Sequence, residues 1–385
     1  MGGVARPLHP GGYSRTTRLL PTRTARGFAS SPFLSSARTS VRAILQQRCL
    51  QGTACRPFRW GCVHCFAIRG SSDARVCRYT QGPHASRWQN RISAPNGHVL
   101  LREGLNLCFY IRRPHQEIAR GVLHSLDAYV HAIGPGALGW YVDEEGSAQE
   151  LDDTGWKRIQ RELLEEQWPL IRLLDAAPGE QRYCFDYSGK PLGDPSLEDE
   201  PDASCAVSFW LPAEYLEEHG PDRVHELALE LAAPLPFYFG QAGLSFNGET
   251  DVIGVLREIR ERCFRYPGLD IPHPSWLSWH LGTRVRGPSW LTFLGQPLLG
   301  ELGGTAGLRS RLSSPGTTVQ QMEGERVVVT LAPCPEAGDT EQGHTLPAYR
   351  ELARVLEPWL YHEESNSGLD FPPEAMRRWE RRFLD

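Results

Sequence analysis

The residue types that carry hydrolytic chemistry are present in this sequence, but not at the spacings that such chemistry uses. A serine nucleophile is commonly presented on a Gly-x-Ser-x-Gly turn, and that pattern does not occur. The nearest candidate, Ser289, follows Pro288, where such a turn needs a flexible residue. A glycine-rich run at 300–307 lacks the Lys-Ser/Thr ending of a phosphate-binding loop and contains Glu301, which would repel phosphate. We therefore expect neither a serine hydrolase nor a nucleotide-binding loop.

Histidines are spaced too widely for a metal site on one helix. His124 and His131 would lie two turns apart on a shared face, whereas zinc-binding pairs on a helix are four residues apart. His273 and His280 are seven residues apart in a segment rich in Pro and Trp. We predict no functional metal and no cofactor.

Carboxylates are the most abundant candidate groups, at 143–145, at 152–153 and between 162 and 166. General acid–base catalysis needs two carboxyl groups in one cleft with their pKa values moved apart, and nothing in the spacing indicates a cleft. The acids could form a solvated face or a docking patch for a partner rich in Arg or Lys. The alternative from another class is a hydrolase-like enzyme that combines these carboxylates with His273 or His280. That hypothesis requires the groups to converge in one pocket.

Charge is distributed unevenly along the 385 residues. Residues 1–90 contain 14 Arg, no Lys and a single acidic residue, Asp73, and so carry a formal charge of +13; the other 27 basic and 45 acidic residues give −18. An acidic body attracts basic partners over long range and repels polyanions. We therefore expect the folded part to bind no nucleic acid.

The first 90 residues differ in composition from the rest. Sequence that is rich in Arg and Ser and poor in acids is typical of a mitochondrial transit peptide. A disordered extension, or upstream sequence translated from a misplaced start codon, would have the same composition, and we favour this interpretation. Cys62 and Cys65 flank His64 with the spacing of half a zinc knuckle, but no second pair follows at matching spacing.

The remaining sequence indicates a protein of a reducing compartment without membrane contact. No run reaches the roughly 18 apolar residues that a membrane span requires. Five cysteines are scattered through apolar stretches of the body, as expected for buried free thiols rather than a disulfide framework. They are Cys108, Cys184, Cys205, Cys263 and Cys334. We expect a cytoplasmic protein.

The body repeats a pattern of a strand that ends near proline, an amphipathic helix and usually a second strand. The three units are expected over 105–142, 205–240 and 326–359. Apolar residues at intervals of three and four give each helix one face for a sheet. Further helices are expected over 153–166, 251–264 and 373–384, and strands over 168–174 and 183–187. Asp152 or Asp153 can cap the first of these helices, and the second unit is expected to contain a short turn of helix over 213–218 and then a longer helix that begins at Pro221. We predict an α+β fold of mainly antiparallel sheet(s) covered by amphipathic helices.

We expect residues 95–385 to form a single domain. The segment 188–203 is rich in Pro and acidic residues, which is typical of an exposed linker or a long hairpin loop. It could divide the body into two lobes that share one sheet.

Several blocks of this sequence, together with the close of the chain, resemble the type VI immunity family. They lie at 101–110, 140–146, 151–156, 265–270, 282–290 and 377–384. The similarity extends over about 97–385, is most specific from Arg265 to Gly304, and does not include the first 90 residues. The resemblance implies a cytoplasmic antitoxin, not an enzyme, that binds a secreted toxin and occludes it sterically. The implied toxin is a nuclease of a type VI or polymorphic toxin system, and its basic substrate groove would suit an acidic inhibitor.

The residues that would contact the toxin are a hypothesis. Polar groups beside Gly, Pro and Trp in loops suit recognition. The alternative is that Arg265 with Asp270, and Arg284 with some acid, are internal ion pairs that brace long loops. The predicted toxin-binding residues are Asp143, Glu144, Glu145, Asp270, Arg284 and Trp290.

Overall fold

The computed structural model describes residues 91–93, 99–176, 181–248, 250, 254–363 and 371–385. The predictions for residues 1–90, including Cys62 and Cys65, lie outside these ranges.

The described strands form one antiparallel sheet of eleven strands. Its order is β10-β11-β9-β8-β2-β7-β6-β5-β3-β4, and β1 pairs with β2. The long central strand β2 pairs with β7 on one side and with β8 on the other. The strands are β1 (Ile92–Ser93), β2 (Val99–Ile111), β3 (Trp140–Val142), β4 (Ala148–Glu150), β5 (Leu170–Leu174), β6 (Cys184–Ser188), β7 (Cys205–Pro212), β8 (Phe239–Gly248), β9 (Leu291–Leu294), β10 (Thr318–Met322) and β11 (Arg326–Thr330).

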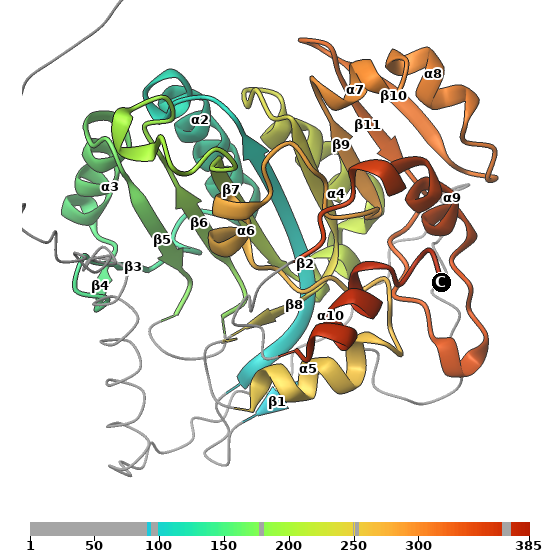
Figure 1. Ribbon diagram of the computed structural model, residues 1–385. Coiled ribbons are helices and arrows are strands. Elements are labelled where there is room, and N and C mark those ends of the chain that lie inside the picture. The colour runs from blue at the N-terminus through green and yellow to red at the C-terminus, as the bar shows by residue number, and fades with distance from the viewer. Residues whose placement is uncertain (1–90, 94–98, 177–180, 249, 251–253, 364–370) are drawn as a thin grey trace, which may run out of the picture.

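Helices cover both faces of this sheet (Figure 1). Helices α2 and α4 pack against each other and against β7 on one face, while α6 and α10 lie in front of the sheet in Figure 1. The α-helices are α2 (His115–Ile133), α3 (Asp153–Glu165), α4 (Ala213–Ala232), α5 (Val255–Cys263), α6 (Pro274–His280), α7 (Leu298–Glu301), α8 (Gly304–Ser310), α9 (Pro347–Leu356) and α10 (Pro373–Glu380). Short 3-10 helices are η1 (Pro195–Leu197), η2 (Thr340–Gln342) and η3 (Glu357–Trp359).

The two faces of the central strands differ in polarity, because successive side chains of a strand point to opposite faces. On the α2 side the ring of Phe209 meets Tyr129 edge-on, with 5.2 Å between centroids. On the opposite side the Asn106 amide donates a hydrogen bond of 2.7 Å to Ser208 Oγ. Burying one aromatic side chain contributes about 1.5–3 kcal/mol, so the aromatic contacts on the α2 side stabilise the fold. The opposite side also buries hydrogen-bonded polar groups.

Local signals predicted the helix starts and breaks. The Asp152 carboxylate accepts a hydrogen bond of 2.8 Å from the Gly155 amide at the start of α3, which confirms the predicted cap. Within α4, Gly220 has a φ of 79°, and the helix restarts at Pro221. This break confirms the predicted short helix followed by a second helix that begins at proline.

The α+β class and the antiparallel sheet are confirmed, whereas some element bounds were wrong. The strand expected to end at Gly240 begins at Phe239 and continues to Gly248. Helix α6 and strands β9 and β10 were not predicted. The segment 188–203 connects β6 to its neighbour β7, as a long hairpin loop would.

Two further predictions concern the cysteines and the membrane. Four of the body's cysteines are buried free thiols, as expected: Cys108, Cys184, Cys205 and Cys263. Within the described ranges, no helix combines the length and the apolar character needed to cross a membrane.

Candidate functional site

The predicted acidic run 143–145 forms the turn between β3 and β4. Asp143 Oδ1 accepts hydrogen bonds from the backbone amides of Glu145 (3.0 Å) and Ser147 (2.8 Å), so this carboxylate shapes the turn. Glu144 is exposed and forms an ion pair of 2.9 Å with Arg158 on α3. Glu145 is exposed as well. The turn therefore exposes Glu144 and Glu145 to solvent, while Asp143 holds their backbone in place.

Asp270 is only 8% exposed and belongs to an internal charge network. Its Oδ1 lies 3.5 Å from a guanidinium nitrogen of Arg286 and 3.5 Å from one of Arg382, and its Oδ2 accepts a hydrogen bond from Gln241. Burial alone would raise the pKa of Asp270, but the two guanidinium groups hold it below its ordinary value. A buried carboxylate with three such partners is not available to a toxin.

The structure also places the other predicted loop residues. Arg265 pairs with Asp339 at 2.9 Å and with Glu341 at 2.6 Å, rather than with Asp270. Arg284 is exposed, and its Nη1 donates a hydrogen bond of 3.5 Å to the Leu360 carbonyl oxygen.

Trp290 is 2% exposed and donates a hydrogen bond of 2.7 Å from Nε1 to the Ala332 carbonyl. Like Asp270, it lies in the interior, so neither side chain can touch a partner unless the fold opens. The six predicted residues therefore do not share one exposed face.

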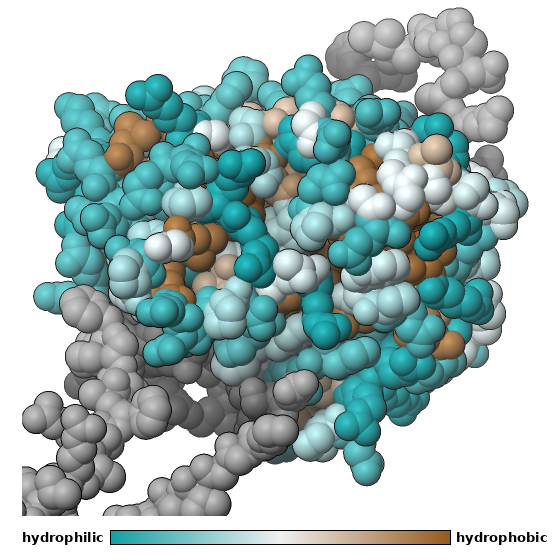
Figure 2. Space-filling view, turned by 45° about the horizontal axis from the view of Figure 1, so that its top comes forward, coloured by the Kyte–Doolittle hydropathy of each residue, from teal (hydrophilic) through white to brown (hydrophobic). Residues whose placement is uncertain are grey.

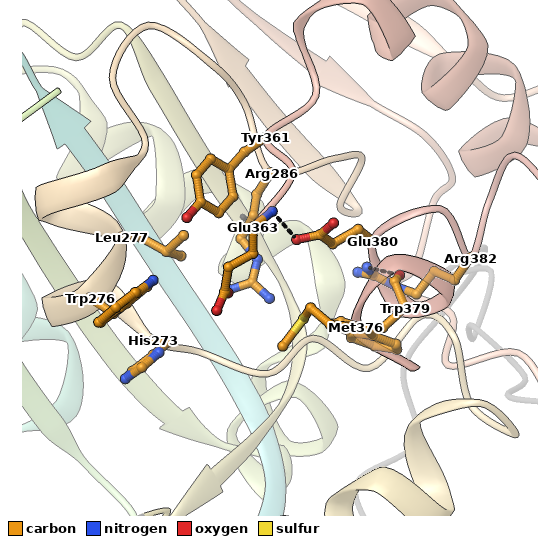
Figure 3. Close-up of a pocket in the computed structure, with 10 residues that line it drawn as sticks. All are labelled: His273, Trp276, Leu277, Arg286, Tyr361, Glu363, Met376, Trp379, Glu380 and Arg382. Atoms are coloured by element: carbon orange, nitrogen blue, oxygen red, sulfur yellow. Dashed lines mark hydrogen bonds between the residues drawn. The ribbon is translucent and has the colours of Figure 1, made fainter. Parts of the chain in front are cut away.

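A small pocket lies between α6, α10 and the segment after η3 (Figure 3). Glu380 Oε1 accepts a hydrogen bond of 2.8 Å from the Glu363 amide, and its Oε2 lies 3.3 Å from His362 Nδ1. The pocket is lined by His273, Trp276, Leu277, Arg286, Tyr361, Glu363, Met376, Trp379, Glu380 and Arg382.

This pocket does not bring together the groups that the hydrolase hypothesis requires. His273 lines the pocket, and the carboxylates that line it are those of Glu363 and Glu380. None of the predicted catalytic acids is among the lining residues. His280 is stacked on Trp276 with 3.9 Å between ring centroids and is not part of the lining. In the part of the chain that the structure describes, no three His, Cys, Asp or Glu side chains converge as metal ligands.

Lys190 forms a buried cationic site that the sequence did not reveal. Its Nζ donates hydrogen bonds to the Ser204 carbonyl (2.8 Å), Ser278 Oγ (2.7 Å) and Ser188 Oγ (3.3 Å). It also lies 4.5 Å from the centroid of the Trp279 ring. Burial disfavours the charged ammonium group and lowers the pKa of Lys190 to about 8. None of these partners is a carboxylate that would offset this effect.

Three large apolar side chains are exposed near the end of α3, namely Leu164 (48%), Trp168 (44%) and Leu170 (59%). Trp168 stacks on Trp279 with 6.2 Å between centroids. The sequence contained one signal for this feature: Leu163 and Leu164 are consecutive, so a helix that buries Leu163 turns Leu164 away from the core.

Figure 2 shows a face on which hydrophilic residues dominate and apolar residues gather in small separate patches.

This chain is similar to proteins of type VI secretion. A family model described as TsiV, type VI immunity for VRR-NUC, matches residues 121–383. A solved structure, the Pseudomonas aeruginosa T6SS protein PA0821, is similar with a TM-score of 0.64 and 22% sequence identity, covering 77% of this chain and 87% of that one. That likeness supports the fold alone. No curated protein matches. The family match begins inside α2 rather than near residue 97. Because the match spans well over half of the chain, this protein belongs to the TsiV family of type VI immunity proteins for VRR-NUC.

Proposed function

We propose that this protein acts in the cytoplasm, where it binds a VRR-NUC nuclease toxin and blocks the face with which the toxin holds nucleic acid. The observation that carries the proposal is the family match over residues 121–383. The proposed partner is a single toxin molecule per immunity protein, and the proposed mechanism is steric occlusion without a cofactor.

Charge supports this choice of partner. Outside the first 90 residues the chain carries a formal charge of −18. A nuclease must attract a polyanion, so its substrate groove is basic. Opposite charge on the two proteins would accelerate their encounter, and the same negative charge would keep this chain away from nucleic acid.

Binding also accounts for the described sites better than catalysis does. The predicted catalytic acids lie on the β3–β4 turn and on α3, away from the pocket that contains His273. Arg286 and Arg382, which line that pocket, are engaged with Asp270. An acid–base pair needs two groups in one cleft, and this pocket does not contain the pair that the sequence suggested.

The test uses the full chain and the VRR-NUC toxin encoded beside it. We expect the two proteins to co-purify and expect nuclease activity to fall linearly with added immunity protein until one molecule per toxin is present. An enzyme that modified the toxin would act at far lower ratios, so substoichiometric inhibition would contradict occlusion. Failure to bind or to inhibit the toxin would remove the proposed function.

A further inference from the structure

We infer that the toxin docks on the end of α3 and the start of β5, through a surface that we call the α3 patch: Leu164, Glu165, Glu166, Trp168 and Leu170. This inference rests on the proposed function, because it takes the partner to be a nuclease with a basic substrate face. Leu164, Trp168 and Leu170 would be the apolar anchors, and Glu165 and Glu166 would meet Lys or Arg side chains of the toxin.

The exposure of the apolar anchors is the first argument. Among the described residues, the large apolar side chains that stand out as exposed are these three, with exposed fractions between 44% and 59%. They lie within seven consecutive positions, at the end of α3 and the start of β5. Such exposed apolar surface with a polar rim marks interaction sites, and Trp is the residue most enriched among binding hot spots.

The rigidity of the patch is the second argument. The Trp168 ring stacks on Trp279, which in turn lies over the Lys190 ammonium group. Pro169 is buried, and its carbonyl accepts a hydrogen bond of 2.9 Å from the Gly189 amide. An anchor that is already held in place loses little conformational entropy on binding, so more of its contact energy contributes to affinity.

The charge around the anchors identifies the partner's chemistry. Burial raises the pKa of Glu162; the 3.4 Å hydrogen bond that its Oε1 accepts from the Leu170 amide and the charge of Arg158 lower it, and the negative charges of Glu144 and Glu166 raise it by smaller amounts. The acids on this side of α3 thus repel one another in the free protein, and basic side chains of a partner would relieve that repulsion.

The basic residues of the same helix do not cancel this charge. Arg158 is paired with Glu144 at 2.9 Å, and Arg161 is exposed four residues before Glu165. Lys157 is the third basic residue of the helix and is exposed as well. Four acids, counting Glu144 and Glu162, therefore outnumber three basic residues. This excess favours a basic protein surface over a nucleic acid or an anionic membrane.

The test measures association and dissociation rates of the full chain with the VRR-NUC toxin, inactivated at its catalytic site. Trp168→Ala should weaken binding at least tenfold, mainly through faster dissociation, because it removes the central anchor. Glu165→Lys with Glu166→Lys should slow association at least tenfold at low salt. The matched control is Glu226→Lys with Glu230→Lys, an equal charge change on α4 at side chains that are 67% and 48% exposed. It should alter the rates about twofold or less.

The outcomes separate the patch from the function. If the unaltered protein binds and inhibits the toxin, but the anchor and charge variants bind equally well, the α3 patch is overturned and the proposed function stands. If the unaltered protein does not bind, both fail. Thermal unfolding of each variant checks the fold, and the charge reversal needs no buried group, so it remains informative if Trp168→Ala is destabilised. Self-association that depends on Trp168 would assign the patch to a second copy of this chain and overturn the inference.

Discussion

Lys190 shows how a single residue can make the stability of this protein depend on pH. The side chain is fully buried, and its pKa is lowered to about 8 from the ordinary 10.5. Below pH 8 the ammonium group is charged in both the folded and the unfolded chain, so folding includes the cost of burying that charge. Between pH 8 and 10.5 the folded protein has released the proton while the unfolded chain still holds it.

Across this window Lys190 by itself should raise the free energy of unfolding by about 3 kcal/mol. The buried thiols act in the opposite direction, because burial raises their pKa values in the folded protein. Lys190→Met should remove the contribution of the lysine, so the difference in the free energy of unfolding between the unaltered protein and this variant should change by about 3 kcal/mol from about pH 7 to 10.5, as measured by urea denaturation. The other lysine of the chain, Lys157, is exposed on α3, so Lys157→Met is the matched control and should keep the contribution of Lys190. An unchanged pH dependence in Lys190→Met would contradict the assignment.

Asp270 gives a second prediction for a single residue. Asp270→Asn keeps the side-chain shape but leaves Arg286 and Arg382 buried without their shared counter-charge. We expect a loss of about 3–5 kcal/mol in the free energy of unfolding, because an unpaired buried charge keeps its desolvation cost. Glu144→Gln, which breaks an exposed pair whose carboxylate side chain is 88% exposed, should change it by about 0.5 kcal/mol or less. Similar values for the two variants would show that the Asp270 network is not what holds these arginines.

At the scale of elements, the connection from α3 to β5 depends on close contact with the end of β6. A Cβ atom added at Gly189 would lie 2.6 Å from Pro169 Cγ and 2.9 Å from His115 Nδ1. Only glycine allows the backbone to approach this closely, and the same approach sets the position of Trp168 and Leu170 on either side of Pro169.

Gly189→Ala should consequently destabilise the protein by about 1–3 kcal/mol and loosen the α3 patch, since Pro169 must move. Hydrogen exchange should become faster at the amides of Trp168 and Leu170. Gly139→Ala is the control, because its added Cβ would make only an ordinary contact of 3.7 Å with the Asp175 carbonyl. Equal exchange in the two variants would mean that Gly189 does not position the connection.

At the scale of the whole molecule, net charge affects how fast this protein meets a partner. The charge of −18 outside the first 90 residues acts over distances of about 10 Å at moderate salt. It therefore affects the encounter with a basic partner, whereas the packed sheet and helices decide whether the complex lasts.

We expect the association rate with the VRR-NUC toxin to fall at least tenfold between about 50 and 500 mM NaCl, with a much smaller change in the dissociation rate. Stopped-flow measurements of the full chain would give both rates. A complex that forms equally fast at all salt concentrations would contradict electrostatic steering, although it would leave occlusion intact.

The sequence by itself determined the features that depend on neighbouring residues. The apolar positions of α2 recur at helical spacing, Asp152 caps α3, and Gly220 with Pro221 interrupts α4, as the sequence predicted. The alternation of strands and amphipathic helices was sufficient to predict an α+β fold, and the sequence blocks were sufficient to predict the family. These signals act over one or two turns of chain, so the order of residues contains them.

Only the tertiary structure decided which polar and aromatic residues reach solvent. The sequence suggests that Asp270 and Trp290 lie in exposed loops. In the structure, Asp270 is buried beside Arg286 and Arg382, and Trp290 is buried in the core. Trp168, for which the sequence predicts a strand, lies just before β5 and is 44% exposed. Exposure depends on contacts between segments that lie far apart along the chain. Asp270 and Arg382 are 112 positions apart, and no local sequence pattern specifies that they pair. Their ion pair is therefore seen only in the folded structure.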